Sequence, residues 1–215
     1  MTLIRATMTL LMGLSVSMPL AWAEDVETVI EGIESTYGNI SSLQASFVQI
    51  NRSAAMGETM QKGKLSLERP RKMRWAFTKP PGKLFVTDGS TMWVWSKADN
   101  QVIISPVAAV AAKGDMTQLL DSLDKLGELF GVELMEGSGK YYQLKLTPKN
   151  QGNVKHIELV VSRKGYTVQK IKTVDGFDNE MELSLQNVKT NIDIPMSSFS
   201  FEVPSNAQVI KTDGP

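Results

Sequence analysis

Few side chains in this sequence are spaced for catalysis or metal binding. His156 is the single histidine and the chain contains no cysteine, which excludes disulfide bonds and thiolate chemistry. His156 falls on the polar side of an alternating strand pattern and has no cysteine or carboxylate pair nearby at ligand spacing. We therefore expect no catalytic residue, no metal site and no cofactor, and we interpret His156 as a surface residue.

Two short segments combine serine with glycine, as nucleophile and phosphate sites do. Asp88-Gly89-Ser90 does not have the pattern of a nucleophile elbow. Gly137-Ser138-Gly139 lacks the strand-to-helix setting and the repeated glycines of a phosphate-binding loop. A serine hydrolase acting on lipid is therefore the least favoured of three hypotheses for the function.

The chemistry that the sequence does concentrate is apolar. Three of the four tryptophans lie between Gly63 and Ser105. Within this stretch the runs 64–68 and 73–78 alternate apolar and polar residues, which is typical of strands with one dry face. Pro70 separates the two runs, and Asp88-Gly89-Ser90 has the length and composition of a hairpin turn between two further strands. The stretch is predicted to be an antiparallel meander.

The aromatic side chains of this meander allow two interpretations. They can be the packed core of a sandwich, which is the usual role of large apolar residues. They can also line a concave cavity for a hydrophobic ligand, helped by adaptable methionines. The residues concerned are Trp75, Phe77, Phe85, Trp93 and Trp95, with Met73 and Met92. The pattern alone does not decide between a core and a cavity.

Helices and further strands must position this meander. Apolar residues at helical spacing predict one amphipathic helix from Asp25 to about Gly38. A strand follows over 45–50, and residues 51–59 are expected to form a hairpin loop. Ser105 as N-cap and Pro106 at the first position predict a short helix over 107–112. A second helix is predicted to begin at Asp115.

The remainder of the chain is predicted to return to strands. Residues 129–135 form one strand, and alternating patterns follow around Leu144, Leu159 and Leu183. Turns at 163–165 and 175–179 give the spacing of an antiparallel meander. No repeat and no linker divides the chain.

The first 23 residues have the pattern of a secretory signal peptide. Arg5 precedes an apolar stretch, and Ala21-Trp22-Ala23 is a small-x-small cleavage signal. We expect residues 1–23 to be removed and residues 24–215 to form one domain in the periplasm. The full chain has 23 basic and 23 acidic residues, so loss of Arg5 leaves a net charge of −1. This balance gives no electrostatic indication of nucleic acid binding.

Several motifs in one order resemble the periplasmic outer-membrane lipoprotein carrier (LolA-type) family. They are LxLxRPxxMRW (65–75), LFVTDGSTMWVW (84–95), LTPK (146–149) and FSFEVPSNAQV (199–209), together with SSLQASF (41–47) and NVKTN (187–191). The resemblance covers nearly the whole chain after residue 23. It implies an α+β, mainly β fold: an open, strongly curved antiparallel sheet, or half-barrel, with short helices forming a lid over its concave apolar face.

In this family the concave face carries the acyl chains of a lipoprotein across the periplasm. The resemblance thus favours the cavity, with lining residues Leu65, Leu67, Met73, Trp75, Phe77, Phe85, Trp93, Trp95 and Leu144. The resemblance also implies that residues 106–125, which we call the lid segment, cover this cavity. The expected lid contacts are Val107, Val110, Met116, Leu119, Leu120 and Leu123.

Arg69 is the residue to which the resemblance gives a specific role. It shares the parity of Leu65 and Leu67, so its head is expected on the concave side. Taken alone, it would be read as an arginine at a strand end reaching solvent. In the family, the arginine of this Arg-Pro motif holds the lid closed through hydrogen bonds, and Arg69 with Pro70 matches it.

The resemblance also implies partners. They are acylated lipoproteins, an inner-membrane ABC transporter that releases them, and a lipidated outer-membrane receptor where one exists. We expect a monomer with no nucleic acid partner. The second hypothesis is a periplasmic carrier or sensor of other lipids or glycolipids on the same fold.

Overall fold

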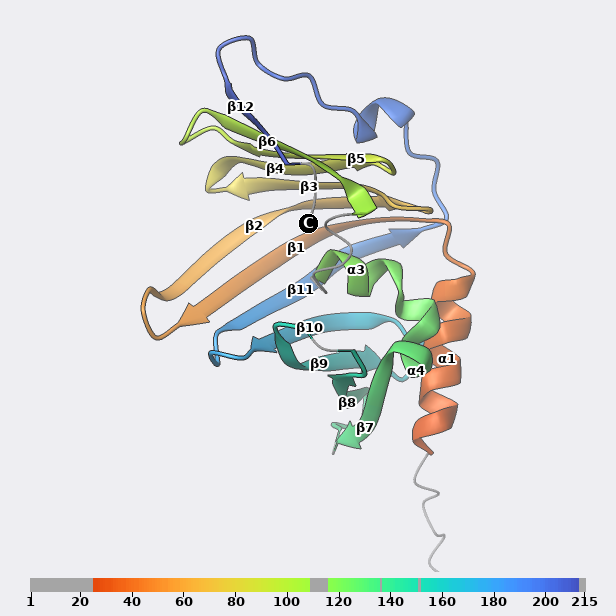
Figure 1. Ribbon diagram of the computed structural model, residues 1–215. Coiled ribbons are helices and arrows are strands. Elements are labelled where there is room, and N and C mark those ends of the chain that lie inside the picture. Colours follow the sequence, from red (N-terminus) through yellow and green to blue (C-terminus); the bar gives the residue numbers. More distant parts are fainter. Residues whose placement is uncertain (1–24, 109–115, 136, 151, 213–215) are drawn as a thin grey trace, which may run out of the picture.

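The computed structural model describes residues 25–108, 116–135, 137–150 and 152–212. The predicted signal peptide lies outside these ranges. Within them, one sheet of twelve strands has the order β12-β6-β5-β4-β3-β2-β1-β11-β10-β9-β8-β7. The strands are β1 Ser42–Ser53, β2 Gly57–Glu68, β3 Lys72–Lys79, β4 Pro81–Asp88, β5 Thr91–Ser96, β6 Gln101–Pro106, β7 Phe130–Met135, β8 Tyr141–Pro148, β9 Val154–Ser162, β10 Val168–Asp175, β11 Glu180–Thr190 and β12 Gln208–Lys211. The expected mainly β fold with an open, curved sheet is confirmed (Figure 1).

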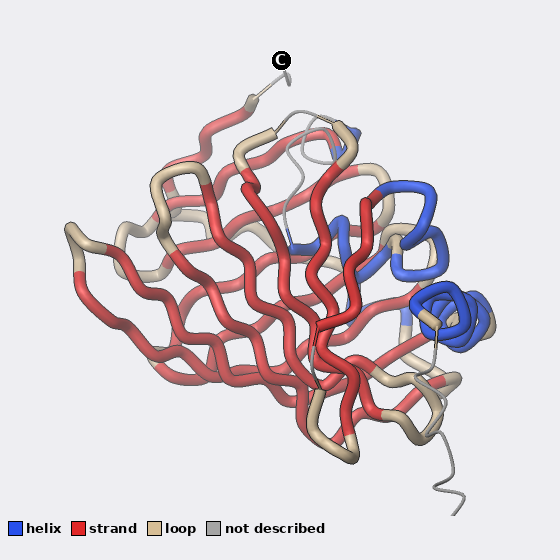
Figure 2. Tube along the Cα trace, turned by 90° about the horizontal axis from the view of Figure 1, so that it is seen from below, coloured by secondary structure: helices blue, strands red, loops and turns tan. Residues whose placement is uncertain are grey.

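Short helices gather on the side toward which this sheet curves (Figure 2). They are α1 Val26–Gly38, α3 Met116–Asp121, the 3-10 turn η1 Leu123–Lys125 and α4 Leu126–Leu129. A further 3-10 turn, η2 Met196–Phe199, belongs to residues 191–207 between β11 and β12, which we call the C-terminal segment. Within the described ranges, no helix is long and apolar enough to cross a membrane.

Two antiparallel meanders meet at β1, which pairs with β2 on one edge and with β11 on the other. The first meander runs from β1 to β6 and contains the tryptophan-rich stretch. The second runs from β7 to β11. One pairing differs from the expected pattern, because β12 lies parallel to β6, with Gln208 opposite Gln101. The chain reaches this edge through the long segment 191–207, which allows a parallel return.

The core lies on the concave face, where the predicted strand parities are confirmed. Leu65, Leu67, Met73, Trp75 and Phe77 are all buried in one apolar cluster. The later strands contribute their apolar alternation to the same cluster: Tyr142, Leu144, Leu146, Ile157, Leu159, Val161, Ile171, Leu183 and Leu185. The predicted alternation of dry and wet faces therefore builds a single core under the helices.

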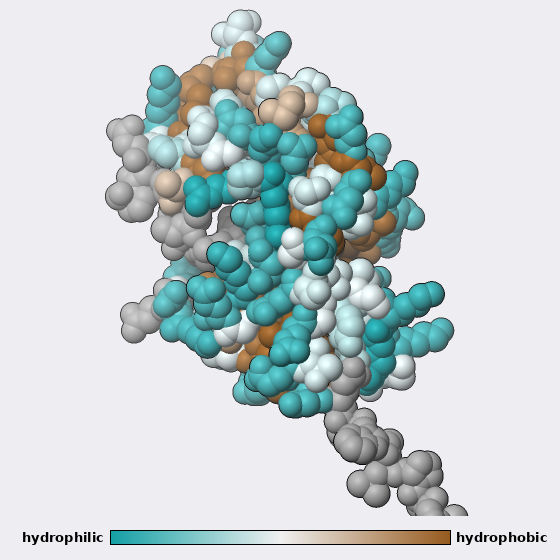
Figure 3. Space-filling view, turned by 90° about the vertical axis from the view of Figure 1, so that its right-hand side faces the viewer, coloured by the Kyte–Doolittle hydropathy of each residue, from teal (hydrophilic) through white to brown (hydrophobic). Residues whose placement is uncertain are grey.

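Helix α1 covers part of this core with the face that its sequence predicts. Val29, Ile33 and Tyr37 are buried in the cluster, whereas Glu27 and Glu31 are exposed. The side of the molecule that carries α1 is accordingly mainly hydrophilic, with smaller apolar patches (Figure 3). The apolar face of α1 thus packs into the core, and its acidic face is exposed to solvent.

Three predicted boundaries are wrong. Residues 51–59 were expected to be a loop, but β1 continues to Ser53 and β2 begins at Gly57, because the polar residues there still pair across the hairpin. Ser105 and Pro106 belong to β6 and so do not form the predicted helix start, whereas residues 107–108 are helical as predicted. Residues 109–112 of that predicted helix, and the predicted second start at Asp115, lie outside the described residues. Leu129 ends α4 and does not begin a strand, since β7 starts at Phe130.

Candidate functional site

Strand register brings the apolar residues of the first meander into rows on the concave face. Leu65 lies opposite Trp75, Trp75 opposite Phe85, and Phe85 opposite Val94. The neighbouring row runs from Leu67 through Met73 and Thr87 to Met92. Directly opposed residues project to the same face of a sheet, so each row forms a continuous strip.

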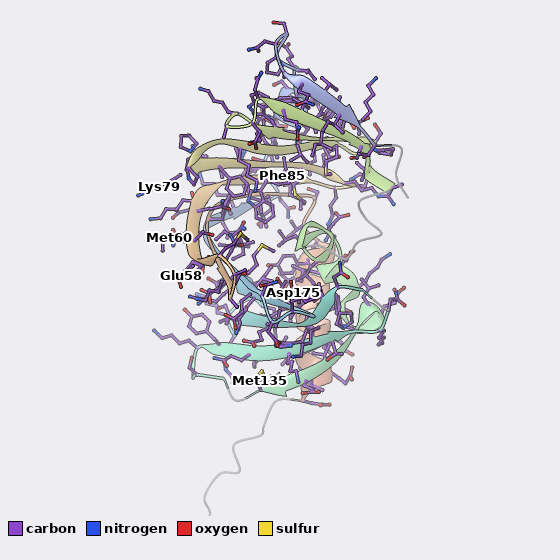
Figure 4. The ribbon with its side chains drawn as sticks, turned by 60° about the vertical axis from the view of Figure 1, so that its left-hand side comes forward. Glu58, Met60, Lys79, Phe85, Met135 and Asp175 are labelled. Carbon is purple, nitrogen blue, oxygen red and sulfur yellow. The ribbon has the colours of Figure 1, made fainter. Side chains whose placement is uncertain are left out.

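The strips become more exposed toward β5. Leu65, Met73 and Trp75 are buried, whereas Phe85, Met92 and Val94 are half-buried. Figure 4 shows Phe85 on the inner side of the curved sheet, with Glu58, Met60 and Lys79 along its outer bend. Lys83 lies at the end of these strips, with its ammonium 5.4 Å from the ring centroids of Phe77 and of Phe85. The concave face therefore offers partly uncovered apolar and aromatic surface.

Trp93 and Trp95 do not belong to this surface, which corrects the expected lining. Trp93 lies opposite Val86, and Trp95 opposite Leu84, so both tryptophans project to the other face of the sheet. There the Trp95 ring packs 6.3 Å from the Phe201 ring of the C-terminal segment. The run Leu84-Phe85-Val86 is apolar on both faces, because Phe85 packs against the concave core and Val86 is buried on the outer face. The sequence pattern of this strand could therefore not distinguish the two faces.

The C-terminal segment forms a second, smaller core on that outer face. Phe199 and Ile194 are buried there, as are Val86 and Val102 of the sheet. The Arg74 guanidinium donates to the carbonyls of Ser198 and Ser200, at 3.2 and 3.4 Å. This segment therefore packs against Trp95, which was expected in the cavity.

The described part of the lid segment lies on the concave core. Figure 1 shows α3 on the side toward which the sheet curves, and Leu119, Leu120 and Leu123 are buried in the same cluster as the strand residues. Leu126 of α4, which was not among the predicted contacts, is fully buried beside them. The Val107 N–H donates to the Ser90 carbonyl at 2.9 Å. Val110 and the side chain of Met116 lie outside the described residues.

The Arg69 side chain reaches from the end of β2 to two of these helices. Its Nη1 donates to the backbone carbonyl of Tyr37 in α1 at 3.0 Å, and its Nη2 donates to Asp124 Oδ1 at 3.3 Å. A second Asp124 oxygen lies 3.2 Å from Nη1, and Asp121 Oδ1 lies 3.9 Å from Nε. The Arg69 side chain is 18% exposed. One guanidinium thus joins the sheet, α1 and the lid segment.

The two carboxylates beside Arg69 are not equivalent. Burial raises the pKa of Asp121 and outweighs the Arg69 charge, which lowers this pKa, while the nearby Asp124 carboxylate raises it further. The 3.9 Å distance to Arg69 is too long for a hydrogen bond. The Asp121 carboxylate therefore carries its charge at an electrostatic cost, and Asp124 makes the direct contacts with the guanidinium.

Tyr37 connects this junction to the second meander. Its hydroxyl oxygen accepts a hydrogen bond from the Val168 N–H of β10 at 2.9 Å, while its carbonyl accepts from Arg69. Burial raises the pKa of Tyr37 to about 12. Because both its backbone and its side chain are engaged, Tyr37 fixes the C-terminal end of α1 over the sheet.

A small apolar pocket of about 10 Å³ lies beside the Arg69 junction. It is lined by Tyr37, Ile40, Leu43, Leu65, Leu67, Arg69 and Leu120. A volume of this size holds no more than about one water molecule. The pocket is bounded by the sheet, the guanidinium and α3, so movement of α3 away from β2 would enlarge it.

The remaining predicted residues are placed as follows. Leu144 is fully buried in the main cluster. His156 projects to the outer face, where its Nε2 lies 3.3 Å from Glu158 Oε1. Across the described ranges, no three His, Asp or Glu side chains converge in a way that could hold a metal ion.

The sequence interpretation missed the acceptors of Arg69. The resemblance implied hydrogen bonds from Arg69 to the lid without naming their acceptors, which are the Tyr37 carbonyl of α1 and the Asp124 carboxylate. Asp121 and Asp124 are three residues apart on a helical segment, so their side chains lie near each other. This spacing could have indicated a pair of acceptors for Arg69. No local pattern could have indicated the Tyr37 carbonyl, which lies 32 residues from Arg69.

The chain is similar to known proteins over most of its length. The family model described as "Outer membrane lipoprotein carrier protein LolA" matches residues 38–202. An outer-membrane lipoprotein carrier protein of Francisella philomiragia subsp. philomiragia is 30% identical over 204 residues, covering 94% of this chain and 95% of that protein. A protein of the same description from Methylobacillus flagellatus is 24% identical over 196 residues, covering 91% and 94%.

The fold is also found among solved structures. An uncharacterized conserved protein from Thermus thermophilus superimposes with a TM-score of 0.55 at 14% identity, covering 86% of this chain and 98% of that one. This likeness supports the architecture of the sheet and its helices.

Proposed function

The chain belongs to the outer membrane lipoprotein carrier protein LolA family, and we propose that it is a periplasmic carrier that binds the acyl chains of lipoproteins and moves them from the inner to the outer membrane. The observation that carries this proposal is the strip of half-buried apolar residues Phe85, Met92 and Val94, in which Phe85 packs against the core cluster that also contains the leucines of the lid segment. In this proposal the protein binds and releases cargo and catalyses no reaction.

The energy of acyl burial supports a lid that opens only for cargo. Uncovering the four buried leucines of the lid segment and α4, Leu119, Leu120, Leu123 and Leu126, would cost about 6 to 12 kcal/mol, at about 1.5 to 3 kcal/mol each. A 16-carbon acyl chain that enters instead gains about 12 kcal/mol, at about 0.8 kcal/mol per methylene. Cargo with several chains therefore offsets the opening, while an unloaded lid stays closed.

We propose that Arg69 is the latch of this lid. Its bonds to Asp124 and to the Tyr37 carbonyl hold the lid segment and α1 against β2. A net contribution of about 1.5 to 3 kcal/mol is usual for a hydrogen bond to a charged group, so such a latch can open and close reversibly. When the lid closes, it withdraws apolar surface from the cargo and favours release.

The proposed route has two partners. An inner-membrane ABC transporter that releases lipoproteins supplies the cargo, and a lipidated outer-membrane receptor, where present, accepts it. The apolar strip binds acyl chains by undirected packing, so it does not select one lipoprotein over another.

The test measures each half of the transfer with a purified acylated lipoprotein. One assay follows transfer from inner-membrane vesicles to the carrier, and the other follows transfer from the carrier to the receptor. The wild type should perform both, and the same lipoprotein without acyl chains should not load. Arg69→Leu should load normally and release poorly, because its lid closes less firmly and its rim is more apolar.

A matched control separates the latch from general loss of charge. Arg52 is paired with Glu58 on the β1–β2 hairpin, where the Arg52 side chain is 40% exposed. Arg52→Leu should load and release like the wild type. Normal release by Arg69→Leu, or an equal loss in both assays, would remove the latch from the proposal.

A further inference from the structure

Trp75 carries a buried hydrogen-bond donor that has no acceptor. The residue is 5% exposed, and its indole Nε1 has no partner in the structure as described. Only one other side-chain nitrogen shares this condition among the described residues, Arg69 Nε, which at least faces Asp121 Oδ1 at 3.9 Å. An indole N–H that is withdrawn from water normally finds a partner.

The surroundings of Trp75 are apolar. The Phe47 ring lies edge-on at 5.2 Å, the Phe77 ring stacks at 6.5 Å, and Leu65 and Phe85 stand opposite Trp75 on the neighbouring strands. A phenylalanine at position 75 would fill much of this space without leaving a donor unpaired. The unpaired indole N–H therefore destabilises the unloaded protein, and a ligand that accepts a hydrogen bond from it would remove this free-energy cost.

The acceptor can be identified from the chemistry of the proposed cargo. The methylenes of an acyl chain accept no hydrogen bond, and the carbonyl oxygen of its ester or amide linkage is the strongest acceptor at the end of the chain. The half-buried strip of Phe85, Met92 and Val94 begins directly beside Trp75. A chain that lies along this strip can place its carbonyl at the indole.

We propose that the Trp75 indole N–H donates a hydrogen bond to the acyl carbonyl oxygen of bound lipid, and so selects acylated over alkylated ligands and fixes how deeply the chain is inserted. This inference rests on the proposed function. It adds one directed contact to a surface that otherwise binds by packing. Trp75 is thereby a specificity residue for the linkage, and the adjacent strip binds the chain.

The test compares two ligands that differ only in the carbonyl, 1-monopalmitoylglycerol and 1-O-hexadecylglycerol. One hydrogen bond should make the wild type bind the ester about two- to tenfold more tightly than the ether. Trp75→Phe should bind both equally, and Trp95→Phe, altered on the outer face, should keep the preference. N-Hexadecanoylethanolamine, an amide, should behave like the ester, which shows that the carbonyl is the recognised group.

Each result has a separate consequence. If the wild type binds neither ligand, the proposed function fails. If it binds both equally, or if Trp75→Phe keeps the preference, only the role of Trp75 is overturned. Should Trp75→Phe not fold, infrared spectra of the wild type with a ¹³C-labelled ester carbonyl decide the question. A hydrogen-bonded frequency supports the contact, and the frequency of the same ester in hexane refutes it.

Discussion

Removal of the Arg69 guanidinium should loosen the lid without unfolding the sheet. Arg69→Leu takes away the hydrogen bonds to the Tyr37 carbonyl and to Asp124, and it leaves both acceptors unpaired. The Arg69 side chain is 18% exposed, so solvent screens the contacts only in part. We expect closure of the lid to weaken by about 2 to 3 kcal/mol, and the open population then rises by about 30- to 150-fold.

Amide hydrogen exchange of the unloaded protein measures this population directly. In the closed lid the Ser122 and Lys125 amides bond to the carbonyls of Leu119 and Ser122, each at 3.0 Å, and the Gly127 amide donates to Glu34 Oε1 of α1 at 2.8 Å. The Gly127 amide, whose hydrogen bond joins α4 to α1, should exchange faster in Arg69→Leu by up to the factor given above, provided that reclosing is faster than exchange. The Ser122 and Lys125 bonds lie within the lid segment and report its local order.

Two comparisons make the exchange result specific. Arg52→Leu, which loses a surface ion pair on the β1–β2 hairpin, should exchange at the lid like the wild type. Amides of β8 and β9 should stay as protected in Arg69→Leu as in the wild type. Lid exchange no faster than in Arg52→Leu, or a parallel rise in the core strands, would refute the latch.

Three further predictions concern charge, the cavity and export. Asp121→Asn should raise the free energy of unfolding at pH 7 relative to the wild type. Because the pKa of Asp121 is raised by folding, binding of a proton to Asp121 stabilises the folded protein. This stabilisation is complete below the pKa of Asp121 in the unfolded chain, and it is lost as pH rises through the higher pKa of Asp121 in the folded protein. Chemical denaturation should therefore show the advantage of the variant shrinking toward pH 4, and a variant less stable than the wild type at pH 7 would contradict this. In variants that keep only one tryptophan of the sheet, a saturating long-chain acyl ligand should change the fluorescence of Trp75 but not that of Trp95, and equal responses would contradict the assignment of faces. N-terminal sequencing of the exported protein should begin at Glu24, and retained Met1 in the periplasmic fraction would exclude the signal peptide.

Much of the fold follows from local alternation in the sequence. Leu65, Leu67, Met73 and Trp75 each stand among polar neighbours, so one face of their strands must be dry, and the structure places them in one core. Helix α1 was equally predictable, because its apolar residues recur at helical spacing and Gly38-Asn39 follows them. Such patterns depend only on neighbouring residues.

What the sequence could not provide depends on contacts between distant segments. The resemblance placed Trp93 and Trp95 in the cavity, and the sequence pattern could not correct this because β5 is apolar on both parities. Only the register of β5 with β4 and the packing of Trp95 on Phe201 place them on the outer face. The parallel pairing of β12 with β6 likewise depends on where the segment after β11 runs. The concave position of Arg69 could be predicted from parity, but its acceptor on Tyr37 could not.

The most direct test of the carrier is native mass spectrometry of the protein purified from its own periplasm. The acyl chains of lipoproteins should remain bound in the concave face, so we predict a complex whose added mass is that of an intact acylated lipoprotein. Arg69→Leu, which should release poorly, should carry more of it. A protein that copurifies only with free lipid or glycolipid, with no acylated protein in either form, would contradict the proposed function.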